Sequence, residues 1–207
     1  DNILRMRFMD QTELEHSIEF SLGDKFFLVT YHPVTLGKDQ VEKCMQELLA
    51  ALDQFPDIKV LFTKANSDAG GRCINRMIDA YAAKNPKRVY SIVSLGQCRY
   101  LSAMKLCEAV IGNSSSGILE APVLKKPTVN IGDRQKGRER FISVLDCQEN
   151  VLDIAVAIQR AMSDEFKVYL GQMEIAHADG KIAVRMKEIL KQVNLQGICQ
   201  KHFYDLK

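Results

Sequence analysis

Short apolar runs that alternate with longer amphipathic stretches constrain the fold of this chain more than any other feature of its sequence. The runs typical of strands are 26–31, 58–62, 89–93, 109–111, 127–131 and a shorter one at 142–145. Strands that alternate with helices predict an α/β fold, a parallel sheet with helices on both faces. Right-handed crossovers would place the carboxyl ends of all strands at one edge, where such sheets bind ligands.

The stretches between these runs have helical spacing or helix-boundary signals. In 40–55, for example, positions 41, 44, 45, 48, 49 and 52 are apolar. The other predicted helices are 10–20, 72–83, 100–107, 149–162 and 181–192, together with one opened by the serines at 115 or 116. Asp10 and Glu13 have the spacing of a capping box, and Gly23 is expected to stop the first helix. Residues 1–9 are expected to be a linker.

Composition excludes several classes of protein. The chain has 207 residues, 46% of them hydrophobic and 26% charged, as in an ordinary globular protein of one large or two small domains. A net charge of +2 does not indicate binding to nucleic acid or to an anionic membrane surface. No apolar run approaches the roughly 20 residues of a membrane span. The start of the chain lacks an initiator Met and a signal peptide, so we expect a piece of a longer cytoplasmic protein.

The six cysteines form no C-x-x-C pair, and Cys44 and Cys107 lie within apolar patterns. Reduced core cysteines are therefore expected in place of disulfides or a zinc site. The histidines have no metal-ligand spacing, and no metal or cofactor is predicted. Neither a G-x-G-x-x-G nor a G-x-x-x-x-G-K-[ST] motif occurs.

The stretch 107–120 combines an apolar run, Gly112, three serines and the possible start of a helix. A serine N-cap and the free N–H groups of a helix start make a site for an anion such as phosphate. Glu120, one turn further on, would then accept hydrogen bonds from a sugar diol. On these residues alone, an ordinary capped helix with a solvated Glu120 is an equal alternative. Asn113-Ser114-Ser115 also matches a glycosylation acceptor, but no secretory signal supports that interpretation.

Polar residues follow the ends of other predicted strands and should lie near the serines. His32 comes after the first strand, and Asn66 and Asp68 come after the second. His32 is a candidate donor to an anion, with an ordinary turn histidine as the alternative; Asn66 and Asp68 would otherwise be local turn caps. In the charged loop 132–140, Arg134 would suit a diphosphate, and a solvated loop is the alternative.

Four segments, in this order, resemble the hydrolysing UDP-N-acetylglucosamine 2-epimerases of sialic acid synthesis. They are 31–35, 66–70, 112–120 and 130–138. The resemblance implies the C-terminal half of a glycosyltransferase-B-type fold, which binds a nucleotide sugar between two Rossmann-like halves. The implied organisation is a linker and first helix at 1–22, a UDP-binding Rossmann-like domain at 23–180 and a C-terminal helical segment at 181–207.

The resemblance also assigns roles along the serine stretch and the charged loop. Ser114 and Ser115 match the serines that hold the UDP diphosphate, and Glu120 matches the glutamate that binds ribose. Arg134 matches the arginine beside the nucleotide. The uracil is expected to meet backbone around 93–95.

His32 is the implied catalytic residue, and it faces the diphosphate and sugar together with Asn66, while Asp68 belongs to the same motif. The family's chemistry is elimination of UDP to a glycal, followed by addition of water to give N-acetylmannosamine. His32 would stabilise the departing diphosphate if it is protonated, or protonate it as it leaves. The implied partners are a UDP-sugar, the N-terminal half of the same enzyme and further copies in a homo-oligomer. Because the carboxylates that remove the C2 proton belong to the N-terminal half, the chain alone is expected to be inactive.

Two alternatives remain at the level of the sequence. One is a non-hydrolysing 2-epimerase or a glycosyltransferase half; the other is a non-enzymatic module that binds nucleotide sugars. His-Pro-Val-Thr at 32–35 argues against the non-hydrolysing enzymes, which typically have His-Arg-Arg-Glu-Asn there. The substrate sugar, N-acetylglucosamine or a diacetylated bacillosamine, stays open.

Overall fold

The computed structural model describes residues 1–34, 40–175 and 179–199. Thr35, the last residue of the first motif, and residues 200–207 of the expected C-terminal segment lie outside these ranges. The chain divides into two compact units, one formed by Met6–Ile175 and the other by Asp1–Arg5 with Ala176–Lys207.

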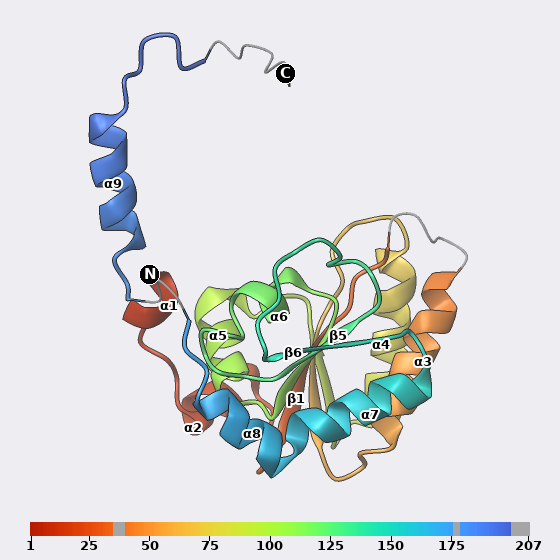
Figure 1. Ribbon diagram of the computed structural model, residues 1–207. Coiled ribbons are helices and arrows are strands. Elements are labelled where there is room, and N and C mark those ends of the chain that lie inside the picture. The colour runs from red at the N-terminus through yellow and green to blue at the C-terminus, as the bar shows by residue number, and fades with distance from the viewer. Residues whose placement is uncertain (35–39, 176–178, 200–207) are drawn as a thin grey trace. The chain divides into compact units, whose positions relative to one another are not determined.

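The larger unit contains the predicted parallel sheet, with six strands in the order β3-β2-β1-β4-β5-β6 (Figure 1). The strands are β1 (Phe26–Thr30), β2 (Lys59–Thr63), β3 (Val89–Ile92), β4 (Ala109–Gly112), β5 (Thr128–Ile131) and β6 (Val144–Cys147). The chain moves outward in one direction from β1 and in the other from β4. The topological switch point, where doubly wound sheets bind ligands, therefore lies at the carboxyl ends of these two central strands.

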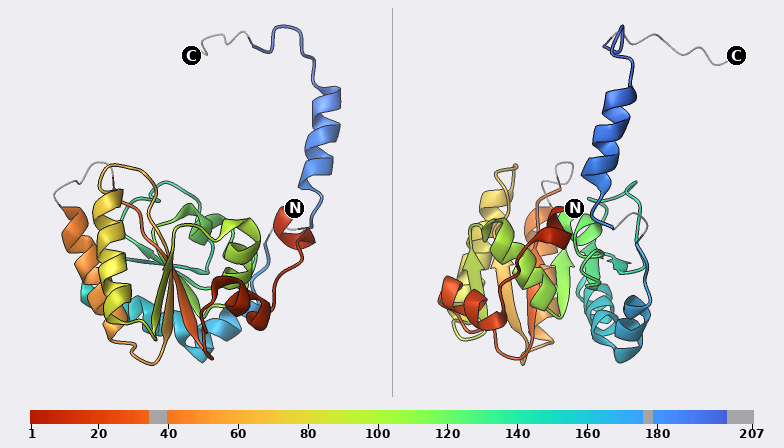
Figure 2. Two further views of the ribbon diagram at one scale, coloured as in Figure 1. Left: turned by 180° about the vertical axis from the view of Figure 1, so that it is seen from behind. Right: turned by 90° about the vertical axis from the view of Figure 1, so that its left-hand side faces the viewer.

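Helices cover both faces of the sheet (Figure 2). One face packs against α3 (Val41–Asp53), α4 (Gly71–Lys84) and α7 (Val151–Met162), and the other against α2 (Gln11–Ile18), α5 (Gly96–Leu106) and α6 (Ser115–Leu119). All five residues of β1 are buried, with Phe27 and Val29 in the core under α3, α4 and α7. Burial on both faces explains why the strands read as continuous apolar runs.

The first helix of the larger unit has the predicted capping box. The carboxylate of Asp10 accepts a hydrogen bond from the Glu13 N–H at 2.8 Å, and the Glu13 carboxylate accepts one from the Asp10 N–H at 3.1 Å. The end of the helix was predicted wrongly. It stops at Ile18, because Glu19 adopts a left-handed conformation with φ of 54°, before Gly23 is reached.

Two further element starts and one whole helix differ from the prediction. Helix α5 begins at Gly96 instead of 100, and β6 begins at Val144 instead of 142. Helix α8 (Asp164–Gly171) was not predicted at all. Its sequence signal is Ser163, whose hydroxyl accepts from the Phe166 N–H at 3.2 Å and starts a new helix directly after α7.

The smaller unit is built around two helices, α1 (Asn2–Arg5) and α9 (Ile182–Gln192). Helix α1 corrects the expectation that residues 1–9 form a linker throughout. The Asp1 carboxylate accepts hydrogen bonds from the N–H groups of Ile182 and Ala183 at 3.0 and 2.8 Å. An acidic group therefore caps the start of α9, where the helix dipole favours negative charge. No helix of the described ranges has the length and apolar character to cross a membrane.

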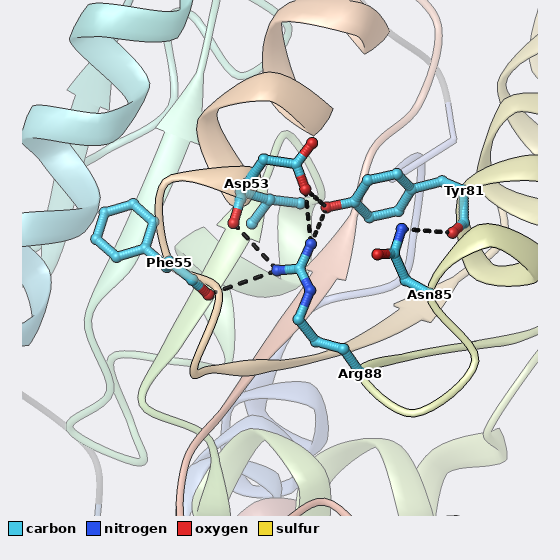
Figure 3. Close-up of polar contacts among 6 residues, drawn as sticks. Asp53, Phe55, Tyr81, Asn85 and Arg88 are labelled. Carbon is cyan, nitrogen blue, oxygen red and sulfur yellow. Dashed lines mark hydrogen bonds and ion pairs between the residues drawn. The ribbon is translucent and has the colours of Figure 1, made fainter.

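A polar cluster braces the amino edge of the sheet (Figure 3). Arg88, just before β3, forms an ion pair with Asp53 at 2.7 Å and also bonds the Tyr81 hydroxyl. Its other guanidinium nitrogen donates to the carbonyls of Leu52 and Phe55 at the end of α3. One arginine thus satisfies the free carbonyls of a helix end and ties α3 to α4 and β3. The polar groups described next lie at the opposite, carboxyl edge.

The six cysteines are all free, as predicted. Cys44 and Cys107 are buried, and burial raises the pKa of their thiols to about 11 and about 12. Both thiols therefore stay protonated at neutral pH and behave as small apolar core residues.

Candidate functional site

A cavity of about 420 Å³ opens at the carboxyl edge of the sheet, above β1 and β2 and beside α5 and α6. Its walls include His32, Leu95, Tyr100, Ser114, Ser116 and Glu120. The expected convergence of His32 with the serine stretch is thereby confirmed. A larger cavity, of about 570 Å³, lies between β6, α7 and α8 and contains none of the predicted site residues. The smaller cavity is therefore the candidate site.

Hydroxyl groups line the inner end of this cavity. The hydroxyls of Thr30 and Thr63, the last residues of β1 and β2, share a buried hydrogen bond of 2.5 Å. Tyr100 lies beside them, and its hydroxyl is buried without a hydrogen-bond partner among the described residues. Burial raises the pKa of Tyr100, so the phenol stays protonated. The sequence prediction missed these three residues, because Thr30 and Thr63 meet only through the register of β1 with β2.

Two glycines allow the serine stretch to lie close to the sheet. Gly112 has φ of 132°, and a Cβ atom placed on it would lie 2.0 Å from the Thr30 carbonyl oxygen. A Cβ on Gly117 would lie 2.6 Å from a methyl carbon of Thr128, where α6 packs on β5. Neither position has room for a side chain, so the local sequence fixes the turn between β4 and α6.

Ser114 is the N-cap of α6, with φ and ψ of −75° and 145°, and its hydroxyl accepts a long hydrogen bond of 3.4 Å from the Ser116 N–H. This bears out the predicted helix start. Ser115 is the first residue of α6 and is half-buried, but it does not line the cavity. Glu120 is the C-cap residue of this short helix and lies in the cavity wall, and its contact with a sugar diol stays a prediction.

His32 is held by its backbone and by one ring nitrogen. Its N–H donates to Oδ1 of Asn113 and its carbonyl accepts from Nδ2 of Asn113, both at 2.8 Å. Ring Nδ1 accepts from the Asn66 N–H at 3.2 Å, which leaves Nε2 as the free ring nitrogen. Burial lowers the pKa of His32, and so does the Arg134 guanidinium, while Asp68 opposes them. The imidazole is therefore mainly neutral at pH 7, with its proton on Nε2.

The charged loop after β5 divides into an inner and an outer part. Nη1 of Arg134 and Nε2 of Gln135 both donate to the Asn113 carbonyl, at 3.1 and 2.8 Å. Gln135 is 3% exposed, whereas Lys136 and Arg138 are exposed. Arg134 therefore reaches back from this loop to the Asn113 carbonyl, and its contact with a diphosphate stays a prediction. The alternative of solvated charges describes the outer residues.

Asn66 and Asp68 lie on the exposed rim of the carboxyl edge and do not line the cavity. Nδ2 of Asn66 donates to the Asp68 carboxylate at 2.7 Å, so the two side chains pair with each other, as local turn residues do. The Asn66 backbone N–H donates to ring Nδ1 of His32 at 3.2 Å. Among the described residues, no group of three or more His, Cys, Asp or Glu side chains is arranged to hold a metal ion.

The glycosylation interpretation of Asn113 is wrong for this fold. The side chain is 0% exposed, and both ends of its amide are bonded to the His32 backbone, which leaves no place for a glycan. Asn113 is instead the residue to which the loops of the site attach. Sequence reasoning missed this, because a buried asparagine after a strand looks like any other turn residue.

Comparison with known proteins identifies the relatives of this chain. The family model described as UDP-N-acetylglucosamine 2-epimerase matches residues 1–191. A GDP/UDP-N,N'-diacetylbacillosamine 2-epimerase (hydrolyzing) from Campylobacter jejuni is 41% identical over 205 residues, which are 99% of this chain and 53% of the relative. Polysialic acid biosynthesis protein P7 from Escherichia coli is 32% identical over 208 residues, 100% of this chain and 52% of that protein. The chain thus spans about half the length of the curated relatives it matches.

Solved structures share the fold at low sequence identity. The UDP-GlcNAc 2-epimerase from Neisseria meningitidis, solved with bound UDP-GlcNAc, has a TM-score of 0.70 at 14% identity, covering 88% of this chain and 49% of that one. A 2-epimerase structure from Listeria monocytogenes has a TM-score of 0.63 at 15% identity, with 90% and 48% covered. These likenesses confirm the expected Rossmann-like half of a glycosyltransferase-B-type fold.

Proposed function

Because this chain belongs to the UDP-N-acetylglucosamine 2-epimerase family, we propose that it is the UDP-binding, C-terminal half of a hydrolysing UDP-sugar 2-epimerase. The observation that carries the proposal is the cavity at the carboxyl edge, where His32 meets Ser114 and Glu120 although it is far from them in sequence. Arg134 does not line this cavity, but it donates to the carbonyl of Asn113, the residue just before Ser114, and so brings a cation next to the serines. Donors for a diphosphate and an acceptor for a diol thus face one cavity.

The proposed reaction converts UDP-N-acetylglucosamine and water into N-acetylmannosamine and UDP. The proton at C2 is removed, the bond from C1 to the diphosphate oxygen breaks, and water adds to the resulting glycal. As UDP departs, negative charge grows on the diphosphate, and positioned N–H donors and cations stabilise that charge. In this chain we assign the role to Nε2 of His32, the start of α6 and the Arg134 guanidinium, with Ser115 contributing as the first residue of α6.

In this proposal His32 is neutral in the free chain and gains a proton when UDP binds. Its pKa is lowered in the free chain by burial and by Arg134. A bound diphosphate is an anion close to the ring and favours the charged imidazolium. UDP binding is therefore accompanied by a rise in the pKa of His32, which lets the ring protonate the departing group.

Asn66 and Asp68 have a supporting part in the proposal. The Asn66 N–H fixes the ring of His32, and Asp68, paired with the Asn66 side chain, holds the loop after β2 in place. Uracil would lie against the backbone near 93–95, because Val93, Ser94 and Leu95 line the same cavity as Glu120.

A hydrolysing reaction is favoured over the two alternatives. The C. jejuni relative and a 27% identical relative from Legionella pneumophila are both named as hydrolysing enzymes. Their names specify diacetylbacillosamine substrates, whereas the family description names UDP-N-acetylglucosamine, so the proposal keeps both sugars as candidate substrates. Product analysis of the full-length protein decides the reaction, because a hydrolysing enzyme releases free UDP and sugar. The proposal further places the enzyme in the cytoplasm as a homo-oligomer.

We expect the 207-residue chain to release no N-acetylmannosamine from UDP-N-acetylglucosamine, although it binds UDP. The reason is that the proposal assigns removal of the C2 proton to carboxylates of the other half, and this chain spans about half of its relatives. A coupled assay for UDP release, with the full-length protein as positive control, measures this. Turnover by the purified chain would contradict the assignment of C2 proton removal to the other half of the enzyme.

Replacing Glu120 and Ser114 separately tests which part of the nucleotide each one binds. We expect Glu120→Ala to weaken UDP about tenfold and leave phosphate unchanged, because a carboxylate that binds a diol contributes nothing to phosphate. Ser114→Ala should weaken both ligands, because it removes a hydroxyl and the cap of α6. Calorimetric titration of each variant measures both affinities, and equal losses for UDP and phosphate in Glu120→Ala would refute the ribose assignment.

A further inference from the structure

We infer that Asn113 is the positioning residue of this site: it sets the places of His32 and Arg134 relative to the serines that follow it. The inference rests on the proposed function for its ligand, UDP, but its structural part is testable without a ligand. Three loops, those after β1, β4 and β5, meet at this residue.

The first contact fixes the backbone of His32. Oδ1 of Asn113 accepts from the His32 N–H and Nδ2 donates to the His32 carbonyl, both at 2.8 Å. The amide thus extends the pairing of β1 with β4 beyond the last strand residues, Thr30 and Gly112. Because the Asn66 N–H holds Nδ1 of the ring, both the backbone and the ring direction of His32 are determined.

The second contact fixes the loop that carries Arg134. The Asn113 carbonyl accepts from Nη1 of Arg134 at 3.1 Å and from Nε2 of Gln135 at 2.8 Å. Two donors on one carbonyl use both of its lone pairs. The next residue is Ser114, the cap of α6, so the cation, the imidazole and the helix start are linked through one residue.

Asn113 is 0% exposed, so its amide makes these contacts away from solvent. Removing the amide would take away the hydrogen-bond partners of the N–H and carbonyl of the partly buried His32, which is costly. The same device recurs on the neighbouring loop, where Asn75 accepts from the Ala65 N–H at 2.8 Å and donates to the Ala65 carbonyl at 3.2 Å. Asparagine amides therefore hold the loop backbones after both β1 and β2, and Asn113 alone also carries a third loop.

Two variants separate positioning from general stability. Asn113→Ala removes both side-chain bonds to His32. Asn113→Asp keeps the shape: an ionised carboxylate accepts from the His32 N–H but repels the His32 carbonyl, whereas a protonated carboxyl restores both hydrogen bonds. Asn85→Ala is the matched control. The Asn85 side-chain amide also donates to a backbone carbonyl, that of Tyr81, at 3.0 Å, and neither residue lines the cavity.

The readouts are the UDP dissociation constant by calorimetry and the pKa of His32 from NMR titration of the imidazole protons. We expect Asn113→Ala to weaken UDP by about tenfold or more and to raise the pKa of His32 toward its ordinary value, as the ring leaves its buried place. For Asn113→Asp, the UDP affinity is compared with that of the original chain at each pH. The difference between the two should shrink as the pH falls, because the introduced carboxyl becomes protonated. Asn85→Ala should lower thermal stability and change neither readout.

Each contrary result is decisive. A folded Asn113→Ala variant with the original His32 pKa overturns the inference even if UDP is not the ligand of this protein. Should Asn113→Ala not fold, Asn113→Asp at acidic pH decides, because its protonated carboxyl makes the same two bonds. If that variant does not fold, positioning by these bonds is contradicted. The same holds if it folds but its His32 pKa and its UDP affinity do not return to those of the original chain. Absence of UDP binding by the original chain, with the His32 effects present, would refute the proposed function and leave the positioning role standing.

Discussion

Replacing Gly112 with alanine is expected to destabilise the larger unit by at least about 4 kcal/mol, among the largest effects of a single substitution. The added Cβ would lie 2.0 Å from the Thr30 carbonyl oxygen, and its φ of 132° is unfavourable for any L side chain. Relief requires β4 to move away from β1, which breaks the junction that carries Asn113. Urea unfolding followed by far-UV circular dichroism measures the loss.

Two other glycines serve as controls for the two parts of this effect. Gly137 has φ of 83° but nothing within 4 Å of an added Cβ, so Gly137→Ala should cost only the backbone strain, about 1–2 kcal/mol. Gly171, at the end of α8, has neither constraint, and Gly171→Ala should be neutral or slightly stabilising. A Gly112→Ala variant no less stable than Gly137→Ala would show that β1 and β4 do not approach as closely as described.

Arg134→Ala is expected to weaken UDP binding by roughly 30- to 100-fold, the largest effect on affinity that we predict. A charge-assisted hydrogen bond to phosphate contributes about 2–3 kcal/mol. The pKa of His32 should rise in the same variant, because the guanidinium is one of the two causes that lower it. Calorimetric titration with UDP and NMR titration of His32 measure the two effects.

The matched control is Arg138→Ala, which removes the same charge from an exposed position of the same loop. It should change UDP affinity by no more than about threefold, because exposed charges are screened by solvent and salt. Arg134→Lys should fall between the two, since it keeps the charge and loses the planar fork. Equal losses in Arg134→Ala and Arg138→Ala would mean that only the net charge of the loop matters.

The fold was largely predictable because its elements carry local signals that agree with their tertiary surroundings. The capping box of Asp10 and Glu13 and the period of 41–52 reflect contacts within one element, and the apolar runs reflect burial on both faces. Element ends were less predictable: α2 ends at Ile18 because Glu19 adopts a left-handed conformation for which the sequence carries no signal. Helix α8 was missed because it follows α7 without a linker.

The candidate site was predictable only in part, for a physical reason. Residues such as His32 and Ser114 stand at strand ends, and a parallel sheet brings strand ends together. Asn113 owes its place to bonds with residues 81 positions before it and 22 after it, and no local pattern encodes such contacts. Thr30 and Thr63 likewise form a pair only through the register of β1 with β2.

Calorimetric titration of the 207-residue chain with UDP, with CMP and inorganic phosphate as controls, tests most directly whether the groups around Asn113 hold a nucleotide diphosphate. We predict saturable binding of one UDP per chain, at least about tenfold tighter than either control, because only UDP offers both a diphosphate and a ribose to this cavity. A folded chain that does not bind UDP, or that binds it no better than phosphate, would contradict the account.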